Sequence, residues 1–145
     1  MVTPTSEQIA EARITHRMPV SGSHTVGAPD GGPGLPGVGW SRDHGDIRVA
    51  HFLGLHAMQI LPLLVLAAAR ANVPERKRLR LAFASSASYV GLFVILLAQA
   101  LRAQSFAHPD AATLIVLLLW VAATAAAMWA SLSGERTDQS HAVVY

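Results

Sequence analysis

The side chains best suited to chemistry gather where the chain passes from polar loop to hydrocarbon, in the stretch 45–66, GDIRVAHFLGLHAMQILPLLVL. Polar and ionisable groups are costly inside a bilayer, and they often mark a functional site. The first candidate site, for a ligand or a proton, therefore consists of the polar and sulfur-bearing residues of this stretch: His51, His56, Met58 and Gln59.

The spacing of the two histidines leaves two interpretations open. His51 and His56 are five residues apart, which places their imidazoles about 140° apart around a helix, so they cannot chelate one metal ion by themselves. In one interpretation His56 is a haem or metal ligand, with Met58 or a second histidine completing the pair. In the other, His56 and Gln59 form hydrogen bonds to neighbouring helices. The hydroxyl groups expected to accept or donate there belong to Ser88, Tyr89 and Thr124.

A second group of polar side chains lies upstream, in and just after a segment rich in glycine and proline. Residues 22–39 contain seven glycines and three prolines, so neither a helix nor a strand can propagate through them. The segment is either a flexible linker or an ordered cap over the membrane domain. The embedded His24, Asp30 and Trp40 favour a cap. The second candidate site, an outer-loop site, consists of His24, Asp30, Trp40, Asp46 and Arg48.

The metal and the cofactor are not specified by any motif. Imidazole and carboxylate groups suit Zn²⁺ or Cu²⁺, and an outer-face set of His24, Asp30, His44 and His51 is conceivable. The chain has no cysteine, which excludes disulfides, thiolate metal sites and covalent haem attachment. It also has no GxSxG, HExxH or P-loop motif, so the sequence favours a non-enzymatic protein over an enzyme.

Composition and patterning indicate an integral membrane protein. Of 145 residues, 52% are apolar and 14% are charged, against roughly 25% charged in typical soluble domains. The apolar residues form three blocks, at about 47–69, 81–101 and 111–132, each near the roughly 20 residues that cross a bilayer as a helix. We therefore expect an all-α fold: a membrane helical bundle with three transmembrane helices and a Gly/Pro-rich N-terminal segment.

Basic residues predict the orientation. The loop between the first two spans carries Arg70, Arg76, Lys77, Arg78 and Arg80, whereas the loop 102–110 carries only Arg102. Because positive loops stay inside, the sequence predicts a bacterial cytoplasmic (inner) membrane protein with the N-terminus outside and the C-terminus cytoplasmic. We expect residues 1–46 to be extracytoplasmic, 47–132 to span the membrane, and 133–145 to form a cytoplasmic tail. The basic loop is interpreted as a topology signal, with no nucleic-acid partner.

Two local patterns complete the structural expectations. Thr5 and Gln8 have the spacing of a capping box, which predicts one short helix near the N-terminus. Small residues recur every fourth position in the second and third spans, for example Ala87 and Gly91, and this spacing favours close helix packing.

The run HTVGAPDGGPGLPGVGWS, followed by GDIRVAHFLGLHAMQILPLL, resembles a family of small bacterial membrane proteins. In that family an HTVG-PDGGPGLP-GWS loop leads into a GDLR-HF-GLHALQ-LPLL helix, and the similarity covers about residues 23–66. The family has no assigned activity, so the resemblance implies membership and a membrane location without a mechanism. Its members have a hydrophobic helix before this loop, whereas residues 1–22 of this chain are polar.

Three functions follow as alternatives. The first is a non-enzymatic membrane component whose outer loop binds a small ligand, a lipid or a partner. The second is a haem- or metal-binding protein that handles electrons or protons through His51 or His56. The third is a subunit of an oligomeric transporter or channel. Expected partners are the lipid bilayer and either further copies of the chain or other membrane subunits.

Overall fold

The computed structural model describes residues 5–16 and 22–133. The elements follow the order α1 (Ser6–Thr15), β1 (Thr25–Val26), β2 (Gly45–Asp46), α2 (Ile47–Arg70), α3 (Glu75–Leu101) and α4 (Ala111–Ser133). The all-α fold with three helices long and apolar enough to span a membrane is confirmed. Of the predicted tail 133–145, only Ser133 is described, as the last residue of α4.

The three long helices have 24, 27 and 23 residues. At 1.5 Å per residue they are about 36, 40 and 35 Å long, against a hydrocarbon core of about 30 Å. The structure differs from expectation mainly at the start of α3, which begins at Glu75 and not at Leu81. The polar residues 75–80 are good helix formers, so the helix continues past the point where hydrophobicity stops marking it.

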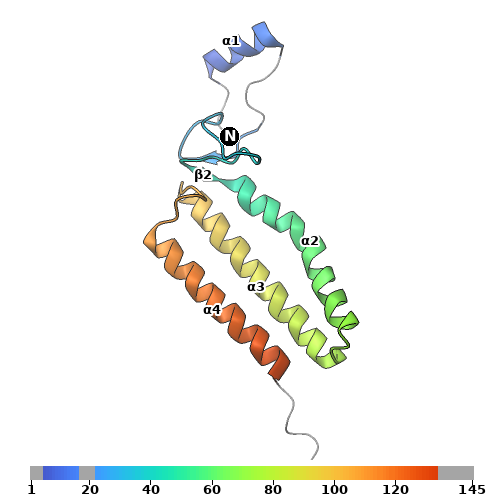
Figure 1. Ribbon diagram of the computed structural model, residues 1–145. Helices are drawn as coiled ribbons and strands as arrows, with labels where there is room; N and C mark the ends of the chain where they lie inside the picture. The colour runs from blue at the N-terminus through green and yellow to red at the C-terminus, as the bar shows by residue number, and fades with distance from the viewer. Residues whose placement is uncertain (1–4, 17–21, 134–145) are drawn as a thin grey trace, which may run out of the picture.

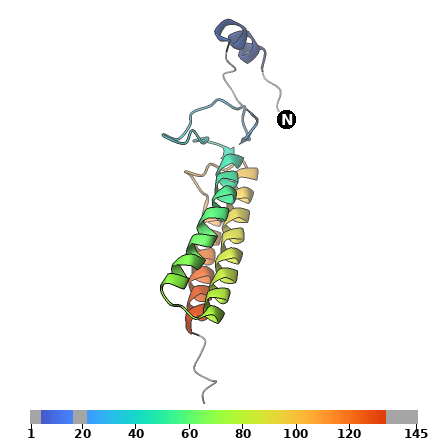
Figure 2. The ribbon, with the colours of Figure 1, turned by 90° about the vertical axis from the view of Figure 1, so that its right-hand side faces the viewer.

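The helix α3 lies in the middle, with α2 packed on one side of it and α4 on the other (Figure 1). Seen after a 90° turn, the three helices overlap, so they form a single narrow layer (Figure 2). The α2–α3 turn lies at one end of this layer. The residues before α2 and the α3–α4 loop lie together at the other end.

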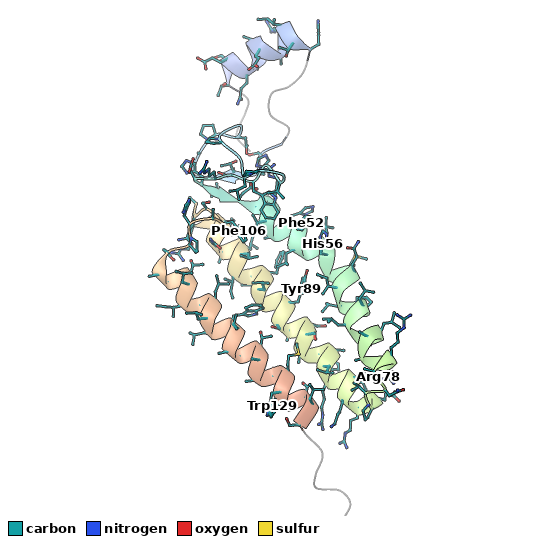
Figure 3. All side chains as sticks on the ribbon, in the orientation of Figure 1. Phe52, His56, Arg78, Tyr89, Phe106 and Trp129 are labelled. Atoms are coloured by element: carbon teal, nitrogen blue, oxygen red, sulfur yellow. The ribbon has the colours of Figure 1, made fainter. Side chains whose placement is uncertain are left out.

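Hydrogen bonds and small residues hold α3 to its two neighbours. The Tyr89 hydroxyl donates to the Leu53 carbonyl of α2 at 2.8 Å, and Figure 3 shows this side chain pointing from α3 toward α2. On the other side, Trp120 Nε1 donates to the Ser88 carbonyl at 2.9 Å. The Ser88 and Thr124 hydroxyl groups also form a short hydrogen bond between α3 and α4.

The expected small-residue packing is present at some positions only. A methyl group added at Gly54 would touch the Phe93 ring at 3.3 Å, and one added at Gly91 would touch Trp120 at 3.3 Å. Both glycines therefore allow an aromatic side chain to lie close against the helix backbone. In contrast, Ala87 is exposed, so that member of the repeat is not buried in a helix contact.

Most of the fully buried residues lie at one end of the layer, beneath the segment that precedes α2. They include apolar residues (Val49, Ala50 and Ala100) and polar ones (Asp46, Gln99, Ser105 and Thr113). Along the rest of the helices, large apolar side chains remain exposed, which is the expected pattern for helices surrounded by lipid. The tightly packed core therefore joins the helix ends to the segment above them.

We call residues 22–46 the cap. Its two short strands pair antiparallel, with Thr25 opposite Asp46 and Val26 opposite Gly45. A further bridge joins Gly34 to Ser41. These pairings fold the glycine- and proline-rich segment back over the end of the helix layer (Figure 1).

The short N-terminal helix α1 is also present. Thr5 is its N-cap and forms the predicted capping box with Gln8. The Gln8 side chain reaches the Asp30 carbonyl at 3.5 Å, which is a long hydrogen bond.

Candidate functional site

The carboxylate of Asp46 organises the cap. It lies at the N-cap of α2, where its Oδ1 accepts the backbone N–H of Arg48 at 2.9 Å. Its Oδ2 accepts the backbone N–H of Ser41 at 2.8 Å and Arg48 Nη2 at 2.6 Å. The residue is only 2% exposed. A buried carboxylate is stable only when it is paired and hydrogen-bonded, and here both oxygens are satisfied.

Arg48 ties the cap loop to α2. Its guanidinium contacts both oxygens of Asp46, and Nη2 also donates to the Gly39 carbonyl at 2.7 Å. The planar fork of arginine suits such paired acceptors better than a lysine ammonium would. One side chain therefore fixes the loop around Gly39 relative to the first turn of α2.

A second carboxylate supports the same arrangement. Asp30 Oδ1 accepts the backbone N–H groups of His24 at 3.1 Å and Thr25 at 2.8 Å. The imidazole Nδ1 of His24 lies 3.1 Å from that oxygen and 3.8 Å from Asp46 Oδ1. The imidazole thus lies between the two carboxylates, and it links the turn at residue 30 to the start of α2.

The environment keeps both carboxylates ionised. Burial raises the pKa of Asp46, but hydrogen bonds from Arg48 and Ser41 outweigh burial and hold the pKa below its ordinary value. Burial acts in the same direction on Asp30, and hydrogen bonds from Thr25 and His24 likewise lower its pKa. At neutral pH the cap therefore contains two negative groups that are held by donors from the cap and from Arg48 of α2.

A hollow of about 460 Å³ opens on the cap. Its polar lining combines imidazole, guanidinium, carboxylate and hydroxyl groups with exposed backbone of the glycine-rich turns. The side chains that supply these groups are His24, Thr25, Ser41, Asp43, His44 and Arg48. The hollow is large enough for a small ligand.

The underside of the cap fits closely on α3 and on the loop after it. At Gly45 an added methyl group would lie 2.0 Å from the Ala100 carbonyl oxygen. The Ser105 hydroxyl donates to the Arg42 carbonyl at 2.5 Å, and Gln99 Nε2 donates to the Ser105 carbonyl at 2.8 Å. The sequence pattern did not identify Gly45, Gln99 or Ser105 as site-forming residues. Gly45 and Ser105 matter through neighbours distant in the chain, and Gln99 matters through its bond to Ser105.

Aromatic rings seal one edge of the junction between cap and helices. The Trp40 ring contacts Phe52 edge-on, with centroids 5.7 Å apart, and Phe106 in the same manner at 5.8 Å. Phe52 and Phe106 lie near each other at the cap end of the layer (Figure 3). Trp40 thus packs between α2 and the α3–α4 loop, and it does not line the hollow.

The structure does not bring the first candidate site together. His51, Met58 and Gln59 are exposed on α2, with Met58 at 81%. His56 is half-buried, its Nδ1 lies 2.8 Å from the Phe52 carbonyl, and its ring lies against the Phe52 ring with centroids 4.0 Å apart.

The hydrogen bonds expected between His56 or Gln59 and the other helices are not found among the described residues. The three hydroxyl groups named for that role bond elsewhere: Tyr89 to Leu53, and Ser88 to Thr124.

The second candidate site is brought together, apart from Trp40. His24, Asp30, Asp46 and Arg48 form one connected network of ion pairs and hydrogen bonds. Within residues 5–16 and 22–133, no group of three or more histidine and acidic side chains is close enough to hold a metal ion. The geometry therefore supports a polar binding site on the cap more than it supports a metal centre.

These features define an α-helical protein with three membrane-length helices and a folded polar cap at one end. Comparison with protein-family models, with curated proteins and with solved structures finds no match to this chain.

Proposed function

We propose that this chain is a non-enzymatic, multi-pass membrane protein of the bacterial cytoplasmic membrane whose cap binds a small zwitterionic ligand. The nearest chemistry is that of a phospholipid headgroup with a phosphate and an ammonium group. The observation that carries the proposal is the polar hollow of about 460 Å³ on the cap.

The charges that line the hollow favour a ligand with groups of both signs. Arg48 is paired with Asp46, so these two charges neutralise each other, and the carboxylate of Asp30 is occupied by hydrogen bonds from His24 and Thr25. No hydrogen bond within the described residues involves the side chains of Asp43 or His44, although both line the hollow. An ammonium group suits the carboxylate of Asp43, and a phosphate oxygen suits the imidazole of His44.

The position of the hollow also suits a headgroup. Its lining includes Arg48, the second residue of α2, so the hollow lies at the end of a membrane-length helix. Because α2 is about 36 Å long and the hydrocarbon core is about 30 Å thick, the end of the helix reaches the headgroup layer. A lipid headgroup beside the helix layer is therefore within reach of the cap.

The proposal is tested by thermal unfolding of the full-length protein in detergent. Short-chain phosphatidylethanolamine and soluble glycerophosphoethanolamine are titrated separately, and we expect a saturable rise in Tm because ligand binds only the folded state. At a concentration 100 times the Kd, that stabilisation is about 2.7 kcal/mol. A rise with the lipid alone identifies a membrane ligand, and a rise with both identifies the headgroup chemistry itself.

The matched variants are His44→Ala, which alters the hollow, and His108→Ala, which removes an exposed histidine of the α3–α4 loop. The Tm rise should be lost in His44→Ala and kept in His108→Ala. Equal responses in both variants, or no response in the unmodified protein, would contradict the proposal. The haem- or metal-binding and transporter alternatives stay predictions, and none of the contacts described above favours them.

A further inference from the structure

We propose that the face of α2 directed away from α3 binds a second copy of this chain, with Gln59 at the centre of the contact. This surface is separate from the hollow on the cap. It does not depend on the ligand proposed above.

The amide of Gln59 is the observation that requires a partner. Gln59 is exposed, and its side-chain amide forms no hydrogen bond within the described part of the chain. It lies twelve residues after Ile47, about 18 Å along a helix of about 36 Å, and therefore near the middle of the span. An amide that faces hydrocarbon at this depth has no water to bond, so it is stabilised by a partner that supplies a donor and an acceptor.

The residues around Gln59 have the spacing of a helix–helix contact. They alternate at intervals of four and three residues, which is the pattern of a coiled-coil seam: Phe52, His56, Gln59, Leu63 and Leu66. At 100° per residue this seam is centred on the side of the helix nearly opposite to Gly54, Ala57 and Leu61, which are half-buried toward α3. The seam is thus available to a helix outside the layer.

The chemistry of the seam fits a second copy of the same chain. An amide has both a donor and an acceptor, so two Gln59 side chains at the same depth can bond to each other. Copies inserted with the same topology have parallel α2 helices, and a two-fold axis then places these two amides together. His56 adds an acceptor, because its Nδ1 faces the Phe52 carbonyl as a donor and its Nε2 is then an unprotonated nitrogen.

The exposed surface of α4 does not need a protein partner in this way. Its large exposed side chains are apolar: Leu114, Ile115, Val116, Leu118, Leu119, Val121, Trp129 and Leu132. The one polar group among them is the indole N–H of Trp129, which lies near the end of α4, where the headgroup layer supplies an acceptor. Lipid covers such a surface without leaving a polar group unbonded. The two flanks of the helix layer therefore differ, and α2 is the flank that associates.

Crosslinking in membranes tests the proposal directly. The chain has no cysteine, so one introduced cysteine reports on one position. Under mild oxidation in vesicles of bacterial lipid, Leu66→Cys in the seam should form a disulfide-linked dimer of the full-length protein. Leu118→Cys, on the exposed surface of α4, should remain monomeric. Dimers from both variants, or from neither, would overturn the proposal. If neither variant forms dimers, the partner of α2 is a different membrane protein.

A second measurement tests how much the Gln59 amide contributes to the dimer. Energy transfer between donor- and acceptor-labelled full-length protein is followed in vesicles as the protein is diluted with lipid. Gln59→Leu should weaken the dimer by about 3- to 30-fold, the range expected for hydrogen bonds between membrane helices. Met58→Leu, at a neighbouring exposed position outside the seam, should leave the dimer unchanged. An unchanged dimer in Gln59→Leu would overturn the role assigned to Gln59.

Discussion

At the scale of single residues, Asp46 links the chemistry of the cap to the start of a membrane helix. Its carboxylate accepts the backbone N–H of Arg48 in the first turn of α2, pairs with the Arg48 guanidinium and accepts the backbone N–H of Ser41 in the preceding turn. The ion pair needs the ionised form, and the hydrogen bonds from the backbone N–H groups are stronger with it. The stability of the cap should therefore depend on the protonation state of this buried group.

The pKa values of Asp46 and Asp30 are both lower in the folded protein than in an unfolded chain. Groups of this kind stabilise the fold above their unfolded pKa, about 3.9, and this stability is lost as the pH falls through their folded pKa. We expect the Tm in detergent to be steady from pH 7 to pH 5 and to fall steeply below about pH 4.

The control for this prediction is Asp46→Asn, which cannot ionise. At pH 7 it should be less stable by roughly 1–3 kcal/mol, the value of hydrogen bonds to a charged group. Between pH 5 and pH 3 its Tm should change less than that of the unmodified protein. If both proteins lose stability in parallel, the acid transition arises from other carboxylates.

At the scale of elements, the contact between β2 and the end of α3 decides whether the cap can lie on the helices. Gly45 is buried, and its backbone approaches Ala100 so closely that no side chain fits. Gly32, in contrast, has nothing within 4 Å of an added methyl group, and its φ is not positive. The two glycines therefore have different roles in one segment.

We predict that Gly45→Ala destabilises the protein by about 3 kcal/mol, because overpacking at a tight backbone contact costs up to this amount. The same exchange at Gly32 should change stability by less than about 0.5 kcal/mol, as expected for an open surface site. Thermal unfolding of both variants measures the difference. Similar values for the two would mean that the cap does not contact α3 in this way.

The sequence predicted the long helices well, because the length of each apolar block matches the thickness of the hydrocarbon core. It predicted the start of α3 poorly, because hydrophobicity marks the lipid boundary and not the end of hydrogen bonding at Glu75. It also grouped His24, Asp30, Asp46 and Arg48, together with Trp40, because polar side chains in and just after a glycine-rich segment suggest an ordered structure.

Other features of the site were beyond sequence reasoning. The side chains of Gln99 and Ser105 donate to backbone carbonyl groups. Every residue has such a carbonyl, so the sequence does not distinguish these two residues from other polar residues near a helix end. The separation of His51 from His56 around the helix was predicted from their spacing. The face of α2 that packs against α3 was not predicted, because three helices can be arranged in several ways. The observed arrangement leaves Gln59 outside the helix contact.

At the scale of the whole molecule, the cap and the basic loop 70–80 lie at opposite ends of the helix layer (Figure 1). The positive-inside tendency then predicts that the cap is outside the cell membrane and this loop is inside. The prediction is checked with single cysteines and a membrane-impermeant maleimide on intact cells. Val38→Cys in the cap should be labelled, and Asn72→Cys in the α2–α3 turn should be labelled only after the membrane is opened. The reverse pattern would invert the proposed topology.

The middle position of α3 has a mechanical consequence. The flanking helices α2 and α4 pack against α3 and scarcely against each other, so a change in the tilt of either flank reaches the other through α3 or through the cap. The cap rests on the last residues of α3 and is hydrogen-bonded to the first turn of α2. The cap therefore fastens α2 to α3 at one end of the layer, whereas the contact between α3 and α4 is held along its length by the bonds of Ser88 with Thr124 and Trp120.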